Sequence, residues 1–254
     1  MINIIFITGT DTGVGKTVLT SLLYAHFSRH GIDVRALKPF CTGNREDALA
    51  LWHLQGGALD IREINPWYYK KPLAPWVAAG PHRAAVPLKA VLAHIQRQTP
   101  KDGFLLVEGV GGLMVPLSNG YGVLEVIAGI GCPVCIVAAN RLGAINHVLL
   151  TVNALETRNL LNWRVILMDR SQKGIAERTN LLALRKLLGE KRVASIQYIS
   201  SIMLEMNDLK EYAKLLQKPL ALASGTRSLS RHYSAFSDVV SGKRRDQKKL
   251  VKKV

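Results

Sequence analysis

A glycine-rich stretch near the start of the chain has the residue types of a phosphate-binding loop. Residues 9–17 read GTDTGVGKT, between an apolar run and an amphipathic one, as a P-loop requires. Gly13 and Gly15 permit positive φ, so that successive N–H groups can turn toward one anion. In such a loop Lys16 reaches the outer phosphates and the Thr17 hydroxyl binds Mg²⁺. The stretch therefore predicts a nucleoside triphosphate site.

The spacing of this loop differs slightly from the usual pattern. Five residues separate Gly9 from Gly15, one more than in the common P-loop. Counting from Thr10 restores the usual spacing but places threonine where the first glycine is expected. Because GKT follows at once, a nucleotide site is favoured over a glycine-rich turn without a ligand.

Two acidic residues are candidates for the metal ion that accompanies a triphosphate. Glu108 ends the apolar run GFLLVEG, where a carboxylate is costly unless it meets a cation. Asp47 begins a predicted helix in REDALAL, and the adjacent Glu46 is its rival. Mg²⁺ prefers such oxygen ligands. A salt-bridged strand end and an ordinary acidic helix start are the alternative interpretations.

A second lysine and a threonine occur in RALKPFCTG. Lys38 ends a predicted strand, and beside a P-loop it could stabilise charge on a transferring phosphoryl group. Thr42 supplies a hydroxyl at the turn that follows. A solvated lysine at a strand end is the alternative interpretation.

The elements that must position these residues alternate along the chain. Apolar runs predict strands at residues 2–8, 34–38, 104–108, 134–139, 164–168 and 193–198. Amphipathic stretches predict helices at residues 16–29, 47–54, 88–99, 144–159, 175–188 and 208–217. This order predicts a single-domain α/β, P-loop NTPase-like fold with a mostly parallel sheet and helices on both faces. The Pro- and Trp-rich residues 65–87 predict a long surface excursion.

Composition adds limits on location and partners. The net charge is +16, of which nine Lys or Arg and two Asp in residues 225–254 contribute +7. We expect residues 1–224 to form the domain and residues 225–254 a basic, flexible tail, which is favoured to be solvated over contacting nucleic acid. Without a signal segment or a run that spans a bilayer, we expect a cytoplasmic protein. The three cysteines predict reduced thiols, and Cys132 and Cys135 are interpreted as packing residues of a buried strand rather than metal ligands.

Taken together, these stretches resemble the dethiobiotin synthetase family. The matching segments are FITGTDTGVGKT, LKPFCTG, EDALAL, NPWYYKKPLAPWVAA, LLVEGVGGLMVPL and RLGAINHVLLT. They occur in the family's order and cover residues 2–152. The family carries the same extra residue in its P-loop.

The resemblance implies an ATP-dependent cyclo-ligase that acts in biotin biosynthesis. Its substrate is 7,8-diaminopelargonate, which reacts with CO₂ to form a carbamate. ATP then phosphorylates the carbamate to a carbamic–phosphoric anhydride, and the second amine closes the ring to give dethiobiotin, ADP and phosphate. Lys16 and Lys38 would stabilise the γ-phosphoryl and carbamate charge, Thr17, Asp47 and Glu108 would hold Mg²⁺, and Thr42 would contact the diamine.

The resemblance also implies binding residues and a homodimer with the substrate at the interface. ATP would be held by the backbone of residues that flank these side chains, namely Gly13, Val14, Gly15, Val18, Gly109, Val110 and Gly111. The start of a partner helix would bind the carboxylate of the substrate, here Gly143, Ala144, Ile145 and Asn146. Helix capping and packing is the alternative interpretation for Asn146.

The sequence differs from the family pattern at the residues that bind the purine base. Met168 and Asp169 stand where the family often has an Asn-Asp pair, and IQY at residues 196–198 replaces an Ile-Pro-Trp-like segment. Asp169 is retained as a candidate for base binding, and the nucleotide preference stays open.

Two other functions are compatible with a P-loop in this fold. A switch ATPase of the partition or septum-positioning type would usually have a second lysine early in the loop, where this chain has Thr10, Asp11 and Thr12. A non-catalytic nucleotide sensor would not need Lys16, Thr17, Lys38 and Glu108 together. The ligase is therefore the favoured prediction.

Overall fold

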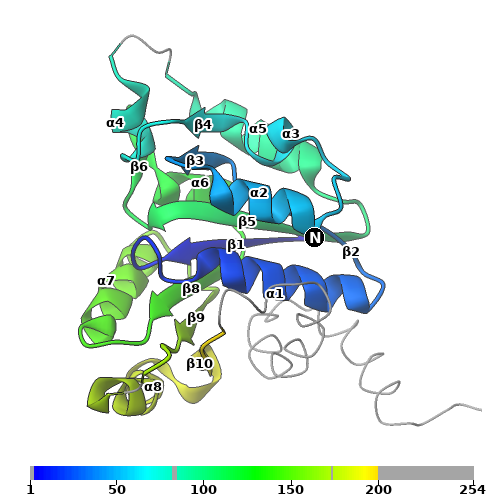
Figure 1. The fold of residues 1–254 in the computed structure, drawn as a ribbon. Helices are drawn as coiled ribbons and strands as arrows, with labels where there is room; N and C mark the ends of the chain where they lie inside the picture. The colour runs from blue at the N-terminus through cyan, green and yellow to red at the C-terminus, as the bar shows by residue number, and fades with distance from the viewer. Residues whose placement is uncertain (1–2, 82–84, 173, 200–254) are drawn as a thin grey trace, which may run out of the picture.

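The core of the protein is one parallel sheet. The structure, a computed structural model, describes residues 3–81, 85–172 and 174–199. Six strands lie in the order β10-β9-β8-β1-β5-β2, and each neighbouring pair is parallel (Figure 1). They are β1 (Ile4–Gly9), β2 (Asp33–Leu37), β5 (Gly103–Gly112), β8 (Val134–Ala139), β9 (Trp163–Met168) and β10 (Val193–Ile196). Each of the six predicted strands corresponds to one strand of this sheet.

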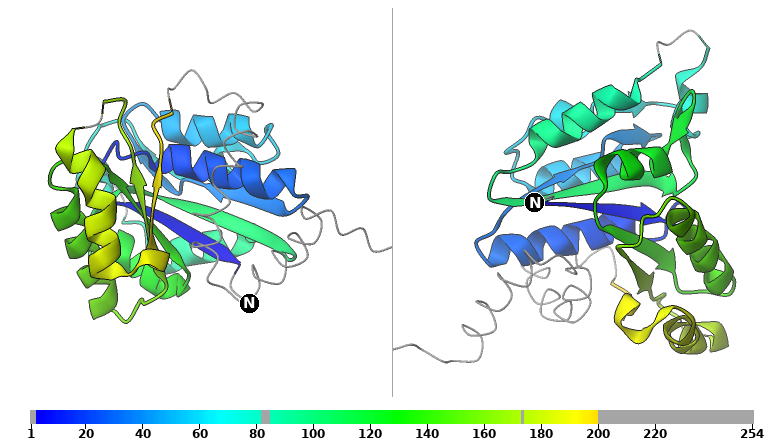
Figure 2. Two further views of the ribbon diagram at one scale, coloured as in Figure 1. Left: turned by 90° about the horizontal axis from the view of Figure 1, so that it is seen from below. Right: turned by 180° about the vertical axis from the view of Figure 1, so that it is seen from behind.

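Helices cover both faces of the sheet, as the sequence predicted (Figure 2). Successive strand residues point to opposite faces, so Ile5 and Ile7 pack with α1 (Lys16–Arg29) and α2 (Glu46–Leu54). Ile4 and Phe6 belong to the opposite core layer. That layer contains α5 (Leu88–Gln98), α6 (Val123–Ile130), α7 (Ala144–Thr157) and a buried leucine of α8 (Ile175–Leu188).

Shorter elements lie around β2 and the carboxyl end of β5. They are β3 (Phe40–Thr42), α3 (Ile61–Ile64), β4 (Trp67–Tyr69), α4 (Pro75–Ala79), β6 (Pro116–Ser118) and β7 (Tyr121–Gly122). At the opposite edge of the sheet, a 3₁₀ turn (Glu190–Arg192) joins α8 to β10. The predicted surface excursion, residues 65–87, also contains the helix α4 and the short strand β4, which pairs with β3, and Tyr69 and Pro75 are buried. Because residues 65–87 are rich in proline, the short strand β4 was not predicted.

Two further predictions about elements are corrected. The strand with Glu108 does not end there but continues to Gly112, because β1 pairs with it as far as Gly9, across an irregularity after Ile7. The helix α6 was not predicted, because it is only eight residues long and Glu125 is its one charged residue. The predicted helix 208–217 and the proposed tail from residue 225 lie outside the described residues.

The parallel arrangement brings the loops after the strands to one edge of the sheet, at the left in Figure 1. Ligands of open α/β sheets bind in crevices at this edge. In the part of the chain that the structure describes, no helix has the length and apolar character needed to cross a membrane.

Candidate active site

The glycine-rich loop after β1 forms the centre of the site. Gly13 and Gly15 have φ of 68° and 98°, in the left-handed region that favours glycine. Gly15 is the N-cap of α1, and among the described residues no side chain caps this helix end. The first backbone N–H groups of α1 therefore point toward a place for an anion, and the helix dipole favours negative charge there.

Gly9 has a steric role that explains the unusual spacing of the loop. A Cβ atom at Gly9 would lie 2.8 Å from the Asp11 carbonyl oxygen and 3.0 Å from Lys16 Nζ. The Lys16 ammonium group folds back over the loop and donates a hydrogen bond of 2.9 Å to that same carbonyl oxygen. Gly9 thus leaves room for the lysine, while Thr10 stands where the common P-loop has its first glycine.

We expect Gly9→Ala to weaken ATP binding about tenfold or more, because displacing a positioned group by about 1 Å has effects of that size. The added methyl group would lie 2.8 Å from the Asp11 carbonyl oxygen, 2.9 Å from Val14 Cγ2 and 3.0 Å from Lys16 Nζ, so the loop must shift to admit it. Calorimetric titration with ATP gives the affinity, and a thermal melt shows whether the variant is folded. A folded variant that binds ATP as tightly as the unchanged chain would contradict this role of Gly9.

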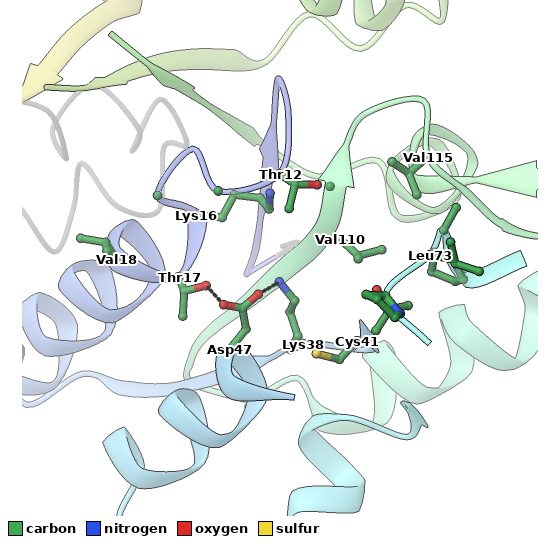
Figure 3. A pocket seen from close by; sticks show the side chains of 17 residues that line it. Thr12, Lys16, Thr17, Val18, Lys38, Cys41, Asp47, Leu73, Val110 and Val115 are labelled. Atoms are coloured by element: carbon green, nitrogen blue, oxygen red, sulfur yellow. Dashed lines mark hydrogen bonds and ion pairs between the residues drawn. The ribbon is translucent and has the colours of Figure 1, made fainter. Parts of the chain in front are cut away.

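Next to the loop, one lysine bridges the two predicted carboxylates. Lys38 Nζ lies 2.8 Å from Asp47 Oδ2 and 2.6 Å from Glu108 Oε1. The Thr17 hydroxyl lies 2.8 Å from Asp47 Oδ1 and 2.8 Å from Glu108 Oε1. Figure 3 shows Thr17, Asp47 and Lys38 facing one another from α1, α2 and the end of β2. The structure therefore brings these four side chains, predicted from separate motifs, into one cluster.

Glu108 is the most deeply buried member of this cluster and does not lie at an open strand end. The Glu108 residue is fully buried, and Thr20 Oγ1 donates to its Oε2 at 2.8 Å. Thr20 was not singled out in the sequence, although it lies one helical turn after Lys16, on the same side of α1. A buried carboxylate with three donors around it is well satisfied.

Of the two rival acids at the start of α2, only Asp47 faces the cluster. Glu46 is exposed, whereas both oxygens of Asp47 accept hydrogen bonds from site residues. The two acids are adjacent on a helix, about 100° apart around its axis. The direction of α2 therefore decides between them, and this direction is a tertiary property.

The charges in the cluster change the pKa values of its members. Burial would lower the pKa of Lys38, but the Glu108 and Asp47 carboxylates raise it above its ordinary value. Burial would raise the pKa of Asp47, but the Lys38 ammonium group and the Thr17 hydroxyl lower it. Burial and the nearby Lys38 charge lower the pKa of Lys16 to about 8. Lys38 is thus held as a cation, while Lys16 titrates near neutral pH.

We expect ATP affinity to fall as the pH rises above the pKa of Lys16, which is about 8. Below that pH the free protein already carries the ammonium group that a phosphate prefers. Above it, binding must first protonate Lys16, so the affinity falls by at most about tenfold per pH unit. Calorimetric titrations from about pH 7 to about pH 9.5 measure this slope. The variant Lys16→Met is the control, and an equal slope in that variant would contradict the assignment.

The cluster opens into a cavity of about 600 Å³. Its polar side contains the loop and Lys16, Thr17, Lys38, Thr42 and Asp47. Its other side is largely apolar and is formed by Cys41, Pro72, Leu73, Ala74, Pro75, Val110 and Val115. Of these residues, only Val110 was identified as a site residue in the sequence. One end of this cavity suits phosphates and the other an aliphatic chain.

A second cavity of about 370 Å³ lies on the other side of the same loop. Both cavities are lined by Thr12, Gly13, Gly15 and Val18. Val14, Met168 and Asp169 line the second cavity only, with Arg141 and Tyr198. Asn140 Nδ2 donates to Asp169 Oδ1 at 2.8 Å, and Asn180 Nδ2 donates to Asn140 Oδ1 at 2.9 Å. This buried network fixes the carboxylate of Asp169 beside the cavity.

Several predicted site residues line neither large cavity. Gly109 lies on β5 beside Glu108, and its backbone faces Phe6 and Val123. Gly143 is the N-cap of α7, Ala144 is buried, and Asn146 is exposed. Within one chain, the start of α7 is therefore not part of the 600 Å³ cavity.

The predicted packing role of the cysteines agrees with their surroundings. Cys132 and Cys135 are buried, and burial raises the pKa of each thiol to about 12. Among the described residues, no group of three or more His, Cys, Asp or Glu is arranged to hold a metal ion. The magnesium site considered below has two carboxylates and a hydroxyl.

The fold and the site define a P-loop nucleotide-binding protein. The AAA domain family matches residues 3–205. A plasmid partition protein of Borrelia burgdorferi, solved with AMPPNP, superposes with a TM-score of 0.57 at 13% identity, over 87% of this chain and 98% of that one. The MinD protein of Aquifex aeolicus, in complex with MinC, gives a TM-score of 0.54 at 13% identity, over 92% of this chain and 96% of that one. At such identities the likeness shows the fold alone.

Sequence comparison gives the family within this class. The chain is 36% identical to the ATP-dependent dethiobiotin synthetase of Bacillus velezensis, over 69% of this chain and 78% of that protein. It is 34% identical to the enzyme of the same name from Thermodesulfovibrio yellowstonii, over 78% of this chain and 89% of that protein. The chain belongs to the ATP-dependent dethiobiotin synthetase family. The predicted resemblance is thereby confirmed.

Proposed function

We propose that this chain converts 7,8-diaminopelargonate, CO₂ and ATP into dethiobiotin, ADP and phosphate. The observation that carries the proposal is the convergence of Lys16, Thr17, Lys38 and Asp47 on one cavity whose far side is apolar. The cations suit the triphosphate and the carbamate, and the apolar side suits the aliphatic chain of the diamine. The membership in the family supports the same reaction.

The proposed reaction requires positioning rather than covalent catalysis by the protein. One amine adds to CO₂ and loses a proton to give a carbamate. A carbamate oxygen takes the γ-phosphoryl group of ATP, and ADP leaves. The second amine then attacks the carbonyl carbon, loses a proton and expels phosphate as the ring closes. Lys16 and Lys38 are proposed to offset the negative charge that accumulates between carbamate and triphosphate.

The cluster has the oxygen donors that Mg²⁺ takes in nucleotide sites. Thr17, Asp47 and Glu108 are proposed to hold the ion, either directly or, for the more deeply buried Glu108, through its contact with Thr17. Two carboxylates and a hydroxyl are few ligands, which fits Mg²⁺ because it usually keeps waters and binds substrate phosphates as well. When bound, the ion would neutralise part of the phosphate charge.

The second cavity is proposed to receive the nucleotide base. It lies on the opposite side of the P-loop from the substrate cavity, so a triphosphate on the loop could extend between the two. Asp169 is proposed to accept a hydrogen bond from a base N–H group. Met168 packs against Gly15, with its Cγ 3.0 Å from the position of a Cβ there, and supplies an apolar surface.

We further propose a homodimer that completes the substrate site. The start of α7, with Gly143, Ala144, Ile145 and Asn146, is proposed to bind the carboxylate of a substrate held by the partner chain. Its place outside the substrate cavity of its own chain supports this division. Light scattering measures the mass of the assembly, and an active monomer would contradict the proposal.

The reaction itself is tested with the purified full chain. Diaminopelargonate, bicarbonate, MgCl₂ and ATP are supplied, and dethiobiotin, ADP and phosphate are quantified. We expect the three products in equal amounts and no appreciable ADP without the diamine. ATP hydrolysis that ignores the diamine and responds to DNA or lipid would instead identify a switch ATPase. Replacing ATP by other nucleotides in the same assay gives the base preference.

A further inference from the structure

An arginine in an unusual backbone conformation lies next to the catalytic cluster. Arg45 is the N-cap of α2 and has φ of 63° and ψ of 11°, in the left-handed region. Side chains with a Cβ atom rarely adopt this region, and they do so where the surroundings compensate for the strain. Arg45 stands two positions before Asp47, so its conformation sets how the first turn of α2 presents that carboxylate.

The side chain of Arg45 is held by hydrogen bonds to the buried residue Asn65 and by a contact with the ring of Tyr68. Arg45 Nε donates to Asn65 Oδ1 at 2.9 Å, and Arg45 Nη2 donates to the Asn65 carbonyl oxygen at 3.0 Å. The guanidinium group also lies 4.9 Å from the centre of the Tyr68 ring. These contacts form two parallel bonds and a cation–π interaction, an arrangement that the planar guanidinium permits and an ammonium group cannot reproduce.

Asn65 continues this chain of bonds to the catalytic lysine. Its side-chain Nδ2 donates to the carbonyl oxygen of Lys38 at 2.8 Å and to that of Pro39 at 3.3 Å. Asn65 is almost completely buried, so its amide group has no solvent with which to exchange these bonds. One amide side chain therefore joins the backbone of Lys38 to the residue that begins α2.

We propose that Arg45 and Asn65 are positioning residues that hold Lys38 and Asp47 in the relative position that their ion pair requires. Neither side chain is among the residues that line the two large cavities. Their effect on the reaction passes through the ion pair of 2.8 Å between Lys38 and Asp47. This inference rests on the proposed roles of these two residues in phosphoryl transfer and magnesium binding.

The test separates the guanidinium group from the backbone conformation. Arg45→Gly keeps the left-handed conformation available and removes only the side chain, while Arg45→Lys keeps the positive charge but loses the fork of donors. For both variants we expect kcat to fall about tenfold or more. The Mg²⁺ concentration for half-maximal rate should rise about tenfold, as when groups that orient metal ligands are lost. Magnesium-free ATP binding, which depends on the P-loop, should change less than about twofold.

Two further variants keep the proposal falsifiable. Arg62→Ala is the matched control, since Arg62 pairs with Asp60 at the surface of α3 and its side chain is 84% exposed. We expect it to behave like the unchanged chain. If Arg45→Gly does not fold, Asn65→Asp serves instead, because it keeps the acceptor for Arg45 and loses the donor to Lys38. Added guanidinium ion is expected to restore part of the rate of Arg45→Gly.

Distinct outcomes separate this inference from the proposed function. A folded Arg45→Gly or Asn65→Asp variant with unchanged kcat and magnesium dependence would overturn the positioning role. The positioning role would also be overturned if the loss of activity were explained by a lower melting temperature and the magnesium dependence were unchanged. If the unchanged chain forms no dethiobiotin at all, the proposed function itself fails, whatever the variants do.

Discussion

Lys38→Ala should lower kcat about 10²- to 10³-fold while changing ATP affinity by less than about threefold. Removal of one preorganised donor that stabilises a transition state has effects of this size on turnover. We propose that the P-loop and the start of α1, rather than Lys38, present the donors for ground-state phosphates. An interaction that acts mainly in the transition state is lost from kcat and not from binding. Steady-state kinetics and calorimetric ATP titration measure the two quantities separately.

The same substitution has a structural cost that the experiment must separate. Lys38 is 1% exposed and Glu108 is 0% exposed, so the variant leaves a buried carboxylate without its nearest cation. Removing one partner of such a pair costs about 3–5 kcal/mol of folding stability. Activity is therefore compared below the melting temperature, with Lys101→Ala at an exposed surface lysine as the control. Equal losses in kcat and ATP affinity would contradict a transition-state role.

The second large effect is expected from the adjacent acids of α2. Asp47→Asn should lower activity about 10²-fold and raise the Mg²⁺ requirement about tenfold or more, because the proposed metal ligand loses its negative charge and becomes a neutral amide. The amide nitrogen would also face either the Lys38 ammonium group or the Thr17 hydroxyl in place of an acceptor. Activity measured over a series of Mg²⁺ concentrations gives both numbers.

Glu46→Gln is the matched control for this prediction. It makes the same chemical change one position earlier, at an exposed side chain. We expect its activity and Mg²⁺ requirement to stay within about twofold of the unchanged chain. If Glu46→Gln has the larger effect, the choice of Asp47 as the ligand is wrong.

The P-loop is an example of a feature that follows from the local sequence alone. Residues 9–17 determine their own conformation, because the positive φ of Gly13 and Gly15 and the helix start at Lys16 follow from neighbouring residue types. The six buried strands were predictable for a similar reason, since runs of Val, Ile and Leu mark strands covered on both faces. The family resemblance strengthened the candidate roles of Lys38 and Asp47, which remain proposals.

The tertiary structure decided what depends on contacts between distant segments. Only the docking of α2 turns Asp47, rather than Glu46, toward Thr17, 30 residues earlier in the chain. Only the pairing of β1 with β5 extends the latter past Glu108 and buries that carboxylate among donors. The bonds from Asn65 to Lys38 and Arg45 likewise join residues that share no local pattern. The physical reason is that a periodic pattern reports the environment of one segment, whereas an active site depends on the relative positions of several.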